Sequence, residues 1–84
     1  MNFKEGDFVK LTYKIDRCFA ILKILEVKED NKYKYKVIKR LHPERRYKDW
    51  YERSIPRVRI GKIDNTKQYK IEVITEDEVK VDIL

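Results

Sequence analysis

The sequence predicts a mainly β protein, folded as one domain over residues 1–84 in a small open barrel of five to six antiparallel strands. Apolar residues recur at every second position in several separate runs, which is the period of a half-buried strand. Polar clusters with high turn propensity separate these runs. With 84 residues, 42% of them hydrophobic, the chain can form one modest core but is too short for a second domain.

The N-terminal half contains three predicted strands. In the first, one face is apolar and consists of Val9, Leu11, Tyr13 and Ile15. Residues 18–27 are apolar on both faces, which favours a long bent strand of a barrel, although a buried helix is the alternative. After a polar turn at residues 29–32, the third strand covers residues 33–41, with Tyr33, Tyr35 and Val37 expected in the core.

The C-terminal part predicts two or three further strands. Residues 58–63 form a short one, in which Gly61 indicates a bulge or a close backbone approach. Residues 69–73 and 79–83 each alternate apolar and polar positions and predict a hairpin with a turn at residues 75–78. In residues 42–55 the alternation stops, and Pro43 suits a first helical turn, so we expect an inserted short helix or loop.

The segment Phe3–Leu11 carries a family resemblance. Its Gly6–Asp7 pair precedes an alternating strand, and in this it resembles the first strand of small SH3-like barrels of the KOW, Tudor and chromo-barrel kind. The resemblance implies a five-stranded open barrel that binds nucleic acid, ribosomal or transcription components, or peptides. The chain departs from the family in an arginine-rich insertion and in lacking a clear set of aromatic cage positions, which argues against a reader of methylated lysine.

Positive charge is concentrated in the middle of the chain. Residues 31–62 carry twelve basic and three acidic side chains, a net charge of +9, whereas the whole chain has a net charge of only +6. Six of the seven arginines lie in this block, and arginine suits bidentate contact with phosphate or carboxylate. We therefore place the predicted nucleic-acid-binding surface there, on Lys34, Lys36, Lys39, Arg40, Arg45, Arg46, Trp50, Arg53, Arg57 and Arg59.

Two features of this surface have a structural as well as a functional interpretation. Trp50 is the only tryptophan, and with Tyr47 or Tyr51 it could stack on bases, or it could close the open end of the barrel beneath Arg46. The lysines at 32, 34 and 36 share one strand face. They either contact phosphates or protect an edge strand from aggregation.

Catalysis has little support in the sequence. Cys18, His42 and Ser54 are each the only residue of their type, so a nucleophile, base and orienting group would all have to be single copies. We expect no catalytic residue, no metal and no cofactor. Asp64 with Glu78 and Lys80 resembles the metal site of some nucleases only faintly, and alternation on a solvent-facing hairpin explains that pattern better.

These observations predict a non-enzymatic binding module whose partner is DNA or RNA. The alternative is a small adaptor or inhibitor, of the kind that a virus or mobile element encodes, which docks on an acidic protein surface. The single cysteine fits a reducing compartment, and the longest apolar run, Cys18–Leu22, is too short to span a bilayer. We therefore expect a cytoplasmic protein without a membrane partner, and the oligomeric state stays open.

Overall fold

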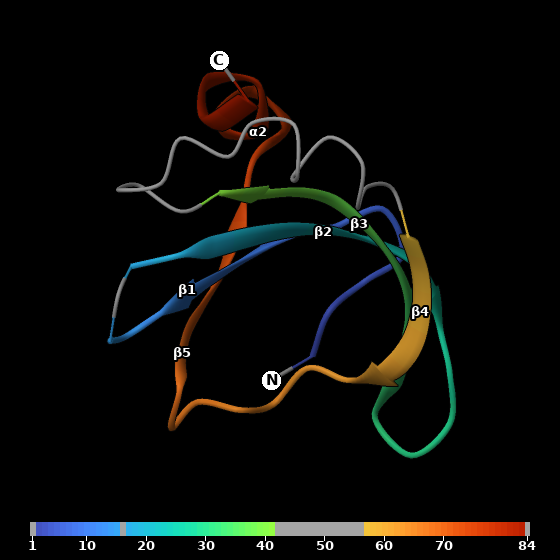
Figure 1. The fold of residues 1–84 in the computed structure, drawn as a ribbon. Coiled ribbons are helices and arrows are strands. Elements are labelled where there is room, and N and C mark those ends of the chain that lie inside the picture. Colours follow the sequence, from blue (N-terminus) through green and yellow to red (C-terminus); the bar gives the residue numbers. More distant parts are fainter. Residues whose placement is uncertain (1, 16, 42–56, 84) are drawn as a thin grey trace.

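The computed structural model describes residues 2–15, 17–41 and 57–83 (Figure 1). These residues form one curved antiparallel sheet and one helix, so the fold is mainly β, as predicted. The sheet does not close on itself, which agrees with the predicted open barrel, and its strand order is β4-β3-β2-β1-β5. The elements are β1 (Phe8–Tyr13), β2 (Phe19–Val27), β3 (Lys32–Leu41), β4 (Arg57–Lys62), β5 (Tyr69–Ile74) and α2 (Glu76–Ile83). The insertion predicted near residues 42–55 lies outside the described residues.

The long apolar run is a strand and not a buried helix. β2 pairs with β1 on one side and with β3 on the other. The β2–β3 register shifts twice, between Ile21 and Leu22 and between Ile24 and Glu26. Such irregularities bend a strand and increase its twist, which is how one sheet comes to curve as strongly as Figure 1 shows.

Turns form at the polar clusters before β1 and between β2 and β3. Gly6 has φ +90°, a conformation that glycine adopts without steric cost, and the Asp7 amide donates to the Lys4 carbonyl at 3.0 Å. Between β2 and β3, Asp30 and Asn31 both have positive φ, and the Lys32 amide donates to the Glu29 carbonyl at 3.2 Å. This is the left-handed pair of a type I′ turn, which suits the twist of a hairpin.

The main core fills the concave face of the sheet. Tyr33 is 4% exposed, its ring contacts that of Phe3 edge-on at 5.3 Å between centroids, and its hydroxyl accepts a hydrogen bond from the Phe3 amide at 3.3 Å. The segment before β1 and the loop after β4 therefore cover this face. The buried members are Phe3, Val9, Leu22, Ile24, Tyr33, Val37 and Ile63, and Tyr35 packs against them, so the predicted core positions of β3 are confirmed.

A second, smaller core lies on the convex face. Helix α2 lies outside the curve of the sheet in Figure 1 and buries Val79 against Ile21 and Ile74. Phe8 and Phe19 pack partly buried against this cluster. Within the described residues, no helix has the length and apolar character needed to cross a bilayer.

The predicted C-terminal hairpin is wrong, because its second strand is helix α2. The Thr75 hydroxyl accepts a hydrogen bond from the Glu78 amide at 3.2 Å, and the Thr75 carbonyl accepts one from Val79 at 3.1 Å. Thr75 is thus the N-cap of α2, and three acidic residues occupy the first turn, where the helix dipole stabilises negative charge. The alternation of residues 79–83 did not predict this helix.

Two details predicted for single residues are also wrong. The β3–β4 register runs through Gly61 without a shift, and a Cβ placed on Gly61 would meet no atom within 4 Å, so this glycine marks neither a bulge nor a close approach. Ile15 lies beyond the end of β1 and is 82% exposed, so it does not extend the core face of that strand.

Candidate functional site

The lysine-rich strand is an interior strand of the sheet. β3 pairs with β2 on one side and with β4 on the other, and Lys36 lies opposite Lys23 on β2 and Val58 on β4. Protection of a sheet edge therefore does not explain the lysines of β3, because the strand has no free edge at these positions. The row of lysines faces out from the middle of the sheet.

Lys23 and Lys36 form a like-charge pair. They are direct partners in the β2–β3 register, which puts their Cβ atoms roughly 4.5–5.5 Å apart, and like charges at such positions destabilise a sheet. Neither ammonium forms an ion pair with any described residue. Lys34 follows on the same face, opposite Glu26, which itself pairs with Lys28 at 3.2 Å. We name Lys23, Lys34 and Lys36 the lysine face.

Exposed apolar side chains border the lysine face on β4. Val58 and Ile60 are the register partners of Lys36 and Lys34, so they share the convex face, and they are 56% and 62% exposed. Alternation along β4 puts Arg59 on the other side, opposite Tyr35. The convex face therefore combines ammonium groups with solvent-exposed aliphatic surface.

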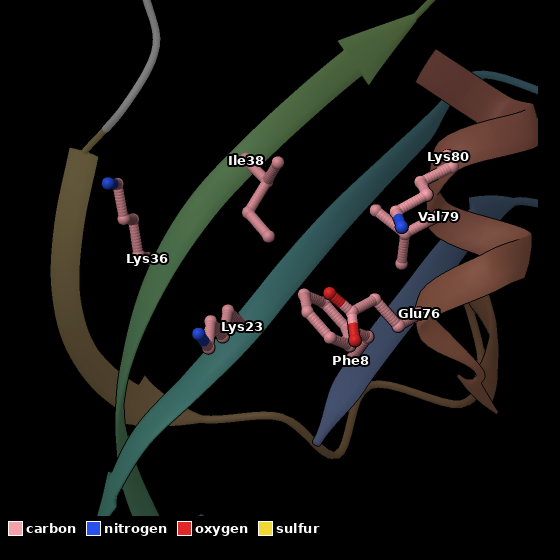
Figure 2. Close-up of a pocket in the computed structure, with 7 residues that line it drawn as sticks. All are labelled: Phe8, Lys23, Lys36, Ile38, Glu76, Val79 and Lys80. Carbon is pink, nitrogen blue, oxygen red and sulfur yellow. The ribbon is translucent and has the colours of Figure 1, made fainter. Parts of the chain in front are cut away.

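A pocket opens where the lysine face meets helix α2. It has a volume of about 440 Å³, and Figure 2 shows Lys23 and Lys36 on its sheet side and Glu76 and Lys80 on its helix side. Three apolar residues line the space between them, namely Phe8, Ile38 and Val79. The Lys23 ammonium lies 5.7 Å from the centroid of the Phe8 ring, within the range of a cation–π contact.

The structure divides the predicted binding residues between two faces. Lys34, Lys36 and Lys39 are at convex positions, since Lys39 is the partner of Ile21. Arg40 pairs with Ala20, which packs on the concave core, and Arg59 pairs with Tyr35 on that same side. Of Arg57 the structure describes only the backbone pairing with Val37. The remaining predicted residues lie outside the described part of the chain: Arg45, Arg46, Trp50 and Arg53.

The described residues contain no group of three or more histidine, cysteine, aspartate or glutamate side chains that could hold a metal ion. Asp64 lies in the loop after β4, whereas Glu78 and Lys80 lie on α2, so the hairpin that would have aligned these three residues does not exist. Cys18 is partly buried just before β2, and its carbonyl accepts a hydrogen bond from the Tyr13 amide at 2.7 Å.

The comparisons with known proteins identify no relative. No family model, no curated protein and no solved structure matches the chain. The resemblance to SH3-like barrels stays a prediction, and the site rests on the geometry and chemistry of its own residues.

Of the seven residues that line the pocket, the sequence analysis predicted only Lys36 and missed the other six: Phe8, Lys23, Ile38, Glu76, Val79 and Lys80. Lys23 carried a usable signal, because it is the only charged residue between Cys18 and Leu25. A single charged residue inside an apolar strand indicates that this position faces solvent, and Lys23 indeed lies on the convex face, opposite Lys36. Lys80 carried no such signal, since its position depends on α2.

Proposed function

We propose that the protein is a non-enzymatic module that binds nucleic acid with the convex face of its sheet. The lysine face contacts phosphates, and the arginines between β3 and β4, namely Arg45, Arg46 and Arg53, add further cations. Phosphate contacts by lysine and arginine supply most of the affinity of nucleic-acid-binding proteins that do not read sequence. We also propose that the protein acts in the cytoplasm, because a chain with a single cysteine fits a reducing compartment.

The observation that carries the proposal is the Lys23–Lys36 pair. A sheet that places two lysines opposite each other gives up stability, and no described carboxylate lies within ion-pair distance to offset the repulsion. A phosphate bound between the two lysines would convert the repulsion into two attractive contacts. Lys34, two positions along β3, extends the row by about 6.5–7 Å, twice the rise of a strand residue.

The test is the salt dependence of binding. Fluorescence anisotropy with a labelled oligonucleotide, between about 50 and 200 mM NaCl, should give a linear fall of log K with log salt concentration. Lys23→Gln with Lys36→Gln should weaken binding and reduce the slope by about 1.4–1.8, the value for two lost phosphate contacts.

The matched control is Lys4→Gln with Lys67→Gln. It removes the same charge from two exposed lysines in loops outside the convex face. This variant should keep the wild-type slope to within the small effect of net charge. An equal loss of slope in both double variants would mean that only net charge matters, and absence of binding at low salt would remove the proposal.

A second candidate function follows from Val58 and Ile60. Exposed aliphatic side chains beside cations also suit an acidic protein surface with an apolar centre. Val58→Ser with Ile60→Ser separates the two functions, because it leaves the lysine face unchanged. A protein partner would be lost with this variant, whereas binding of nucleic acid through phosphates would be retained.

A further inference from the structure

The pocket beside α2 is an open depression with an apolar middle and charged groups around it. Its volume of about 440 Å³ lies inside the range of roughly 300–1,000 Å³ that is usual for small-molecule sites. Three of the seven lining residues are apolar and four are charged, so the pocket suits a ligand that has both an apolar and an ionic part. Figure 2 shows Ile38 between Lys36 and helix α2, and Phe8 between Lys23 and Glu76.

The charges around the pocket are unequally distributed. Lys23 and Lys36 make the sheet side purely cationic, whereas the helix side carries one carboxylate, Glu76, together with Lys80. An anionic group is therefore attracted to the sheet side, whereas the opposite charges of Glu76 and Lys80 offset each other on the helix side. A ligand that fits this arrangement has a phosphate at one end and a flat apolar group with N–H donors at the other.

We infer that this pocket takes one unpaired base of a bound nucleic-acid strand, while Lys23 and Lys36 hold the adjacent phosphates. The base would pack on Phe8, Ile38 and Val79, and its edge would donate a hydrogen bond to Glu76. Stacking on an aromatic ring tolerates every base, because each base has a π-face. This inference deepens the proposed function and rests on it.

A duplex cannot use the pocket in this way. Its bases are stacked and paired, and extrusion of one base costs a few kcal/mol. A single strand offers its bases without that cost, so the pocket makes the protein prefer single-stranded over double-stranded nucleic acid. DNA and RNA share the base and the phosphate on which the inference depends, and both serve as probes.

The first experiment uses the wild-type protein alone. Anisotropy titrations compare a labelled single strand, the duplex of the same sequence, and an abasic strand with the same number of phosphates. We expect the abasic strand to bind about 5- to 140-fold more weakly than the intact strand, the equivalent of one stacked base. The duplex should also bind more weakly than the intact strand.

The second experiment changes the floor of the pocket. Ile38→Thr keeps a β-branched side chain and the net charge but removes apolar surface from the pocket. Its control is Ile60→Thr, the same substitution on the neighbouring strand of the convex face, outside the pocket lining. Ile38→Thr should weaken binding of the intact strand several-fold and leave the abasic strand unaffected, whereas Ile60→Thr should change neither.

The outcomes separate the two proposals. Salt-dependent binding with equal affinity for intact and abasic strands would overturn the pocket inference and leave the proposed function standing, as would tighter binding of the duplex. No binding of any of the three probes at low salt would overturn the proposed function itself. The comparison of probes uses unmodified protein, so it decides the matter even if Ile38→Thr does not fold.

Discussion

The two glycines of the chain are a matched pair for testing backbone strain. Gly6 has φ +90° in the turn before β1, whereas Gly61 lies in β4 without a positive φ. A Cβ on either residue would meet nothing within 4 Å, so steric contact does not distinguish them. Any difference between their alanine variants reports the backbone conformation alone.

Gly6→Ala should therefore lower the free energy of unfolding by about 1–2 kcal/mol, the cost of a left-handed conformation for a residue with a Cβ. Gly61→Ala should leave it unchanged or raise it by up to about 1 kcal/mol, because alanine loses less entropy in a strand. Urea denaturation measures both. Equal losses in the two variants would contradict the assigned turn.

The lysine face implies a conflict between stability and binding at Lys36. Lys36→Gln removes a like-charge contact with Lys23 and should raise the free energy of unfolding by about 0.2–1 kcal/mol while it weakens nucleic-acid binding. Lys28→Gln is the control, because it breaks the exposed ion pair with Glu26 and should change stability by at most about 1 kcal/mol in the opposite direction. A loss of stability in Lys36→Gln, measured by denaturation at low salt, would show that the lysine pair is not repulsive.

At the scale of elements, helix α2 shows how two local signals compete. Val79, Val81 and Ile83 alternate as in a strand, but Thr75 followed three residues later by Glu78 is the spacing of a helix N-terminal capping box. Three alternating positions are too few to identify a strand, and the capping signal was the informative one. Strands β1, β2 and β3 were predictable because each is a longer run with its own turn, whereas β5 was predicted from three alternating positions, no more than residues 79–83 have.

Thr75→Ala tests the cap. The substitution removes the acceptor of the Glu78 amide and should lower the free energy of unfolding by about 1 kcal/mol. Thr66→Ala is the control, since Thr66 lies in the turn before β5 and its hydroxyl has no hydrogen bond to a described residue. Thermal denaturation of both proteins should show the loss in Thr75→Ala only.

The order of strands in the sheet could not be predicted from the sequence. Lysines that alternate with tyrosines have the same pattern on an edge strand and on an interior strand, and only the pairing of β3 with both β2 and β4 decides between them. For the same reason the predicted site joined residues that the register separates, such as Lys36 and Arg59. The alternation of side chains between the two faces can be predicted from one strand alone, whereas the strands that pair with it depend on the rest of the chain.

At the scale of the whole molecule, the charge distribution predicts opposite salt effects on folding and on binding. The net charge is +6, and the lysine face concentrates part of it, so added salt screens repulsion in the folded protein. The thermal midpoint of the free protein should rise between about 50 and 200 mM NaCl, while the stabilisation by bound oligonucleotide should shrink. Melting curves with and without the oligonucleotide measure both, and a fall of the free protein's midpoint would contradict the prediction.

The pairing of β1 with β5 also affects how the protein folds while it is being synthesised. Phe8 lies opposite Ile74 and Tyr13 opposite Tyr69, so strands from opposite ends of the described chain complete this side of the sheet. On the ribosome, β1, β2 and β3 emerge well before β5, and one edge of β1 stays unpaired in the meantime. Folding to the native sheet is therefore completed only after β5 has been synthesised, and until then the nascent chain exposes the unpaired backbone groups of the β1 edge.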